Sequence, residues 1–228
     1  MHDYPKRLIE VDLPIAYLWA RTILSKAPGE GDVPVEVPLM QSMWLAKKAS
    51  RERERAELFR RQLELLLLMF DDLAKSDDPK RRGYLLQDLL NRTFDLHQIP
   101  VVRLFTRNKG AEQIDGAFKI EGWHYLVECR WCQKLADIRE LDGLKGQVDR
   151  SGKQTMGLFL SINGWSNNVP GLLKQNPEKS LLLMEGYDLH TVLCGRADLR
   201  DFIFAKVAKL NLEGEPFLGV AEYLDEAS

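Results

Sequence analysis

The sequence is poor in cysteine and has no long apolar run. Its 228 residues include three cysteines, and such a small, odd number argues against a disulfide framework and for a reducing, cytoplasmic location. The longest apolar candidate, residues 65–70, falls far short of the roughly 18 residues that can span a bilayer. The opening MHDYPKRLIEVDLP holds no uninterrupted apolar stretch, so we expect neither a secretory signal nor a membrane segment.

A strong net charge is also missing. The 32 basic and 34 acidic residues leave a net charge of −2 and a pI near 6.1, which excludes a uniformly basic coat for nucleic acid. A nuclease stays compatible with this balance, because clustered carboxylates lower the pI and a local basic patch is enough to contact phosphate. The hydrophobic content of 45% suffices for one domain with a sizeable core plus an extension.

Residues 40–75 predict one long helix. The segment follows a Pro- and Gly-rich connector at 28–39 and itself contains neither residue. Its apolar residues alternate between spacings of three and four and form a stripe along one helix face: Ala56, Phe59, Leu63, Leu66, Phe70 and Leu73. Two interpretations stay open, a helix that dimerises and a helix that packs on its own domain. The charged run KKASRERERAELFRR is typical of a solvated helix face, with DNA contact as the alternative.

A turn-rich break, SDDPKRRG at 76–83, separates this helix from a compact domain. We therefore predict an N-terminal extension over residues 1–79 and a domain over residues 80–228. Apolar periodicity and turn residues predict these elements within the domain: helix 84–97, strands 99–105, 113–120 and 123–131, helix 137–150, strands 156–162 and 180–186, and helix 198–210. The order α-β-β-β-α-β followed by β-α predicts an α/β fold with a mixed central sheet flanked by helices.

The two central strands meet at Glu121-Gly122, which can form a two-residue hairpin turn. Pairing the strands about this turn places Asp115 directly opposite Glu128, with Arg130 on the same face. Like charges so placed repel, and a divalent cation between them would remove the conflict. In the alternative interpretation Asp115 caps a turn and Glu128 pairs with Arg130, and the sequence leaves both open. The opposite face is predicted to be core: Ile114, Phe118, Ile120, Trp123, Tyr125, Val127, Cys129 and Trp131.

The same alternation argues against a metal or redox site at Cys129-x-x-Cys132. Cys129 points to the apolar face, and Cys132 points the other way if the strand continues. A zinc site also needs a second pair of ligands, and the third cysteine and the four histidines lack that spacing. We therefore expect Cys129 to be a core residue.

The acidic pair and its surroundings resemble the PD-(D/E)xK nuclease superfamily, and more narrowly the Mrr-type restriction endonuclease catalytic domain. The motif stands here as Ile114-Asp115-Gly116 followed by Glu128-Cys129-Arg130. The supporting stretches are GYLLQDLLNRTFDLHQIPV, GAEQIDGAFKIEGWHYLVECRW, GLFLSINGWS and LLLMEGYDL. The likeness covers residues 82–210 and implies a restriction-endonuclease-like core.

The resemblance implies a metal centre. Asp115 and Glu128 would ligate Mg²⁺, or Mn²⁺ in its place, together with the backbone carbonyl of Cys129. Arg130 occupies the position of the family's lysine and cannot lose its proton, so it could serve only to position groups or to neutralise charge. Lys145 on the following helix is a candidate replacement for that lysine. Three further residues are candidates for an accessory role at the metal or the phosphate: Gln87, Asp88 and Gln113.

These implications predict a Mg²⁺-dependent endonuclease that cuts double-stranded DNA, similar to type II or type IV restriction enzymes and acting in restriction or antiviral defence. We expect a cytoplasmic homodimer that pairs through the 40–75 helix. The segment DYPKRLIEVDLPI looks like the opening of large DNA methylases of phage-defence loci, which suggests docking to a methylase or to an ATPase or helicase partner. The alternative is a catalytically impaired nuclease-fold module that binds DNA or a partner of a defence complex.

Overall fold

The computed structural model describes residues 36–107, 112–176 and 178–226, with the backbone alone for residues 36–41, 103–107 and 112–113. The chain divides into two compact units, Met1–Glu52 and Arg53–Ser228. The predicted docking segment at the N-terminus lies outside the described residues. The first unit contributes only the start of the long helix α2 (Glu36–Ala74) to the description, and the remaining elements belong to the second unit.

The predicted elements of the domain are confirmed to within a few residues. In chain order the structure contains α3 (Pro79–Leu96), β1 (Val101–Arg107), β2 (Glu112–Ile120), β3 (Trp123–Arg130), α4 (Ile138–Asp149), β4 (Thr155–Ser161), α5 (Val169–Gln175), β5 (Leu181–Glu185), α6 (Gly186–Leu193), α7 (Leu199–Glu213) and α8 (Val220–Glu226). The sequence interpretation missed α5, α6 and α8, because each has at most eight residues and shows too few turns to reveal a helical period. None of the described helices is both long and apolar enough to cross a membrane.

Two helices begin earlier than predicted. Helix α2 starts at Glu36, inside the predicted connector, because Pro38 falls in its first turn, where a missing N–H costs nothing. Helix α3 starts at Pro79, since the Asp78 side chain accepts hydrogen bonds from the N–H groups of Lys80 (3.0 Å) and Arg81 (3.1 Å).

The five strands form one mixed sheet in the order β1-β2-β3-β4-β5. Strands β1, β2 and β3 pair antiparallel, whereas β3, β4 and β5 pair parallel. Helix α4 connects β3 to β4, and α5 connects β4 to β5, as parallel neighbours require. The predicted α/β class with a mixed central sheet is therefore confirmed.

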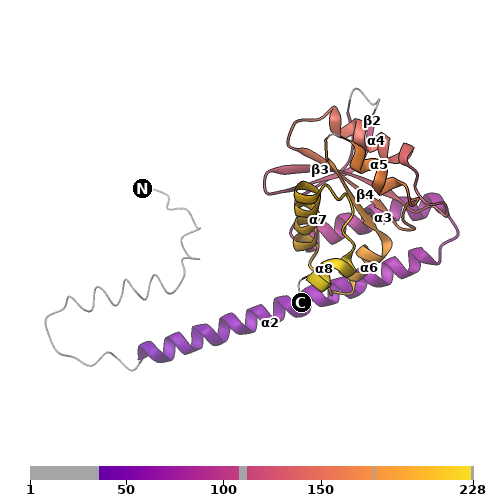
Figure 1. Ribbon diagram of the computed structural model, residues 1–228. Coiled ribbons are helices and arrows are strands. Elements are labelled where there is room, and N and C mark those ends of the chain that lie inside the picture. Colours follow the sequence, from indigo (N-terminus) through magenta and orange to yellow (C-terminus); the bar gives the residue numbers. More distant parts are fainter. Residues whose placement is uncertain (1–35, 108–111, 177, 227–228) are drawn as a thin grey trace, which may run out of the picture. The chain divides into compact units, whose positions relative to one another are not determined.

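Helices cover the sheet (Figure 1), and an apolar layer lies on each of its faces. The larger layer joins α3, α6, α7 and the second half of α2 to one sheet face, through residues such as Phe94, Phe118 and Phe202. The smaller layer joins α4 and α5 to the other face, around Leu144 and Phe159. The protein thus has a helix–sheet–helix arrangement, and the edge where β2 and β3 separate lies close to the start of α4.

The apolar stripe of α2 packs on its own domain. Leu63, Leu66, Phe70 and Leu73 are buried, and Phe70 stacks on Trp131 with ring centroids 5.2 Å apart. Of the two interpretations of this helix, the structure shows packing within the chain, and these contacts run across the predicted boundary at residue 79. Dimerisation through this helix and the domain boundary itself stay predictions.

The predicted hairpin turn is confirmed. Glu121 and Gly122 both have positive φ, 46° and 84°, as a type I′ turn requires. The ladder that follows pairs Ile120 with Trp123 and continues to Gly116 opposite Val127. This register is the one that counting about the turn predicts, and it brings Asp115 and Glu128 to the next step of the two strands.

Candidate active site

Strands β2 and β3 stop pairing at the two predicted acidic residues. The last ladder pair is Gly116–Val127, and beyond it the carboxylate of Asp115 accepts a hydrogen bond from the backbone N–H of Cys129 at 3.3 Å. Ile114 is buried as predicted, but the prediction of its face was wrong, because it packs with the α4 layer and not with the Phe118 side of the sheet. The prediction that Trp123 belongs to the core was wrong too, since this residue next to the hairpin turn is 40% exposed. Strict alternation does not persist along β2 beyond Gly116, where the pairing with β3 ends while the pairing with β1 continues.

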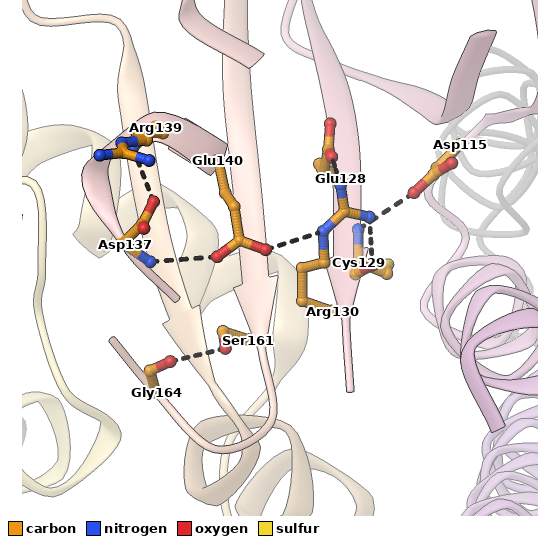
Figure 2. A network of polar contacts seen from close by, with 9 residues as sticks. All are labelled: Asp115, Glu128, Cys129, Arg130, Asp137, Arg139, Glu140, Ser161 and Gly164. Carbon is orange, nitrogen blue, oxygen red and sulfur yellow. Dashed lines mark hydrogen bonds and ion pairs between the residues drawn. The ribbon is translucent and has the colours of Figure 1, made fainter. Parts of the chain in front are cut away.

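Arg130 lies at the centre of a polar network that joins β3 to α4 (Figure 2). Its Nη2 forms an ion pair with the carboxylate of Glu128, and its Nη1 donates to the backbone carbonyl of Cys129 at 3.4 Å. On the other side, its Nε lies 3.5 Å from Oε1 of Glu140. Figure 2 shows the guanidinium between Glu140 and the Glu128–Cys129 segment. The interpretation that pairs Glu128 with Arg130 thus describes this conformation.

Glu140 is held in place by the start of α4. Its Oε2 accepts a hydrogen bond from the backbone N–H of Asp137 at 3.0 Å, and the Asp137 side chain accepts one from the N–H of Arg139 at 2.9 Å. The Asp137 side chain also accepts the backbone N–H of Glu140, and this bond and the Oε2 bond form a capping box, which satisfies N–H groups that the first helical turn leaves free. Oε1 of Glu140 is therefore the oxygen that faces Arg130.

The environment opposes the charge on Glu128. Burial is the main cause that raises the pKa of this carboxyl above its ordinary value, and the negative charges of Asp115 and Glu140 raise it further. The Arg130 guanidinium acts in the opposite direction and lowers it. Glu128 thus lies near two further acidic side chains and one arginine, and an added cation would offset the repulsion among the acids.

Cys129 serves the site through its backbone. Burial raises the pKa of its thiol, and the charges of Asp115 and Glu128 raise it further, so the sulfur stays protonated. Cys129 is buried and Cys132 is exposed, which confirms that the two cysteines point apart. The carbonyl of Cys129 remains the one oxygen donor that this residue offers.

The oxygen atoms present fit a hard divalent cation. Two carboxylates and a carbonyl are the donors that Mg²⁺ or Mn²⁺ prefers, and Mg²⁺ in proteins usually keeps several waters beside one or two carboxylates. In the described part of the chain, no group of three or more His, Cys, Asp or Glu side chains is arranged to hold a metal ion. The remaining ligands would have to be the Cys129 carbonyl, water or substrate. In this conformation Arg130 engages two of the three oxygen donors.

The structure does not bring Lys145 to the acidic pair. Its ammonium group forms an ion pair with Asp149, one turn later in α4. The same side chain lines a groove beside α5 and the start of β5, with Leu173 and Leu181 among its neighbours. Lys145 therefore lies on the side of α4 that faces β5, away from β2.

The accessory candidates have different surroundings. Asp88 forms an ion pair with Arg92 at 2.7 Å, and its side chain is 29% exposed, as expected of an ordinary surface helix residue. Gln87 is half-buried in α3. Gln113 stands opposite Thr106 in the β1–β2 ladder, and its side chain lies outside the described part.

Sequence reasoning missed Glu140 and Asn91. The spacing Asp137-x-x-Glu140 before an apolar helix is a capping-box signal, and it would have predicted that Glu140 lies at the start of α4. Asn91 lies one turn after Gln87 in α3, and its Oδ1 would come 3.7 Å from a Cβ placed on Gly116. No pattern in the sequence distinguishes Asn91, because its place beside β2 depends on how α3 packs.

A cleft of about 550 Å³ adjoins the network at the end of β3. It is bounded by the start of α3, the 132–135 segment and the start of α4, and its lining includes Arg82, Lys134 and Glu140. Arg82 is fixed there because its Nη2 donates to the carbonyl of Trp131 at 3.2 Å. The lining also includes Asp77 and Asp137, so two basic and three acidic side chains line the opening.

The fold and the site together define the class of protein: an α/β protein with a mixed sheet and an acidic site at the point where β2 separates from β3. No protein-family model matches the chain, and no curated protein does. Among solved structures, the chain is similar to a protein of unknown function, AF1548, with a TM-score of 0.37 and 12% identity over 45% of this chain and 56% of that chain.

The chain is also similar to the small subunit (R.BspD6I2) of the heterodimeric restriction endonuclease R.BspD6I. The TM-score is 0.41 and the identity 15%, over 72% of this chain and 86% of that subunit. At such low identities and TM-scores, what the chain does has to be argued from its own site.

Proposed function

We propose that the chain is a Mg²⁺- or Mn²⁺-dependent endonuclease that hydrolyses phosphodiester bonds of double-stranded DNA in restriction or antiviral defence. One observation carries the proposal. Where β2 separates from β3, Asp115 accepts the N–H of Cys129, while Arg130 contacts Glu128 and the Cys129 carbonyl. This closeness supports the site that the PD-(D/E)xK resemblance implies, with arginine in place of lysine.

In the proposed reaction, Asp115, Glu128 and the Cys129 carbonyl would hold the cation. A bound divalent cation supplies a water of lowered pKa and stabilises the charge that develops on the phosphate. Arg130 stays protonated and therefore contributes charge and hydrogen bonds to the phosphate, not proton abstraction. Arg82 and Lys134 line the neighbouring cleft and would neutralise phosphates of the flanking DNA backbone.

A nicking assay tests the proposal. Supercoiled plasmid is incubated with the wild type and with Mg²⁺ or Mn²⁺, and Asp115→Asn and Glu128→Gln are expected to abolish cleavage while they preserve side-chain volume. Asp142→Asn is the matched control, because this exposed residue of α4 removes the same charge without touching the site. Nicking that survives both site substitutions would refute the assignment of the site. A wild type that binds DNA and metal yet never nicks would refute the activity.

The second candidate is a module without catalysis that binds DNA or a partner subunit. It is favoured by the contacts of Arg130, since the guanidinium engages both Glu128 and the Cys129 carbonyl. A filter-binding measurement beside the nicking assay separates the two candidates, since a DNA-binding module would retain DNA on the filter and show no metal-dependent nicking.

A double-strand break needs two active sites, so we further propose that the chain acts as a homodimer or together with a methylase, ATPase or helicase partner. Sedimentation of the full chain with and without DNA measures the homodimer directly.

A further inference from the structure

Arg130 competes with any cation that enters the proposed site. Its guanidinium is bound to a carboxylate oxygen of Glu128 and to the carbonyl of Cys129, and both are among the three oxygen donors of that site. A guanidinium and a divalent cation cannot use the same oxygens from the same direction, because both are positively charged. Cation binding through Oε1 of Glu128 and the Cys129 carbonyl therefore requires that the guanidinium move away from these oxygens.

Glu140 provides the place to which the guanidinium can move. One carboxylate oxygen of Glu140 is fixed by the capping box at 3.0 Å from the Asp137 nitrogen, and the other lies 3.5 Å from Nε of Arg130. The position of Glu140 in the first turn of α4 stabilises its negative charge through the helix dipole. The hydrogen bond between Asp137 and Glu140 therefore stays in place whichever contact Arg130 makes on its other side. The 3.5 Å distance between Nε of Arg130 and Oε1 of Glu140 can shorten when a cation binds Glu128.

We infer that Glu140 is a positioning residue that holds Arg130 between two carboxylates and thereby sets the affinity of the Asp115–Glu128 site for a divalent cation. This inference rests on the proposed function, because it concerns the same site. With Glu140 present, Arg130 keeps a charged partner when it leaves Glu128. Without it, the guanidinium loses that partner, stays on Glu128 and competes more strongly with the cation.

Mn²⁺ binding to the full chain, measured by titration calorimetry without DNA, tests the inference. Glu140→Gln is expected to weaken Mn²⁺ binding about fivefold, the scale of one partly exposed ion pair. Glutamine can still accept the Asp137 N–H bond, so the capping box survives the substitution. Asp142→Asn removes an exposed acid from the same helix and is expected to leave Mn²⁺ binding unchanged.

A double-mutant cycle with Arg130→Met decides whether Glu140 acts through Arg130. Arg130→Met removes the competing charge and is expected to tighten Mn²⁺ binding. In that background Glu140→Gln is expected to change the affinity by less than about twofold, because no guanidinium remains to be positioned. An undiminished fivefold effect would overturn the inference, since Glu140 would then act on the cation directly.

The same titrations separate this inference from the proposed function. If neither the wild type nor Arg130→Met binds Mn²⁺ at millimolar concentration, the metal site itself is refuted, and the inference with it. If both bind Mn²⁺ and the effect of Glu140→Gln is independent of residue 130, the positioning role alone is refuted. Thermal unfolding of each variant checks that the fold is retained, and Glu140→Asp, which keeps the charge, is expected to restore part of the wild-type affinity.

Discussion

The buried pair of Lys206 and Asp188 allows a sharp prediction about stability. Both side chains are fully inaccessible to solvent, and the Lys206 ammonium lies 3.0 Å from the Asp188 carboxylate. Its other two protons are donated to the carbonyls of Leu183 (2.8 Å) and Leu218 (2.6 Å). The second carboxylate oxygen of Asp188 accepts the N–H of Val220 at 2.8 Å. The pair therefore joins β5, α6, α7 and the start of α8.

Lys206→Met is expected to destabilise the domain by about 4 kcal/mol. Methionine fills a similar volume between the rings of Phe202 and Phe217, which lie 4.3 and 5.1 Å from the ammonium, so little packing is lost. The cost comes from a buried carboxylate without its counter-ion and two carbonyls without a donor, and removing one partner of a buried pair costs roughly 3–5 kcal/mol. At about 2–4 °C per kcal/mol for a domain of this size, the melting temperature should fall by about 8–16 °C.

Thermal and urea unfolding followed by circular dichroism measure this loss. Lys209→Met is the matched control, because Lys209 lies one turn later in α7 and pairs with partly exposed glutamates, and it should lower the melting temperature far less. The double variant Lys206→Met/Asp188→Asn should lose less than the sum of the single variants, because the asparagine no longer leaves a buried charge. Additive single losses, or a Lys206→Met protein that melts within about 2 °C of the wild type, would show that the ion pair carries little of the stability.

Two further predictions concern the carboxylate of Glu128 and the close approach of Gly186 to the backbone of Ile162. Because the pKa of Glu128 is raised above 4.5 in the folded state, its contribution to stability is complete below pH 4.5 and is lost as the pH rises through the folded pKa. The melting temperature of Glu128→Gln relative to the wild type should therefore increase from pH 4 to pH 7 in a scanning calorimeter, and a constant difference would contradict the pKa shift. Gly186→Ala should cost about 1–3 kcal/mol in urea unfolding, because its Cβ would lie 2.4 Å from the carbonyl oxygen of Ile162. Gly143→Ala, with nothing within 4 Å of the added carbon, should be neutral or stabilising in the same assay.

Much of the fold follows from local patterns. The hairpin is the clearest case, because a two-residue turn at Glu121-Gly122 fixes the register of both strands and so determines which residues lie opposite each other. The prediction failed at Ile114, where the ladder between the strands ends. At Ile114 β2 is still paired with β1 but no longer with β3, and the sequence does not state where the pairing with β3 stops.

The sequence predicts only the part of the site whose residues lie on the β2–β3 hairpin. Asp115, Glu128 and Arg130 come together because their positions depend on the same two strands. The contribution of α4 depends instead on how that helix is rotated over the sheet. Lys145 follows Glu140 by five residues, which is a rotation of about 140° around a helix, so the two side chains cannot both face Arg130. The structure places Glu140 on that side and Lys145 toward β5.

The charges around Arg130 bear on whether the site binds a cation. A purely structural ion pair is most stable when its charges balance, because unpaired buried charge is costly. Here Asp115 and Glu140 both lie near Glu128, and burial together with these like charges raises the pKa of Glu128 against the opposing effect of Arg130. The arginine at the lysine position thus offsets only part of what opposes the charge on Glu128. A cation bound at Glu128 would offset this repulsion, which agrees with the cation site that we propose, with or without catalysis.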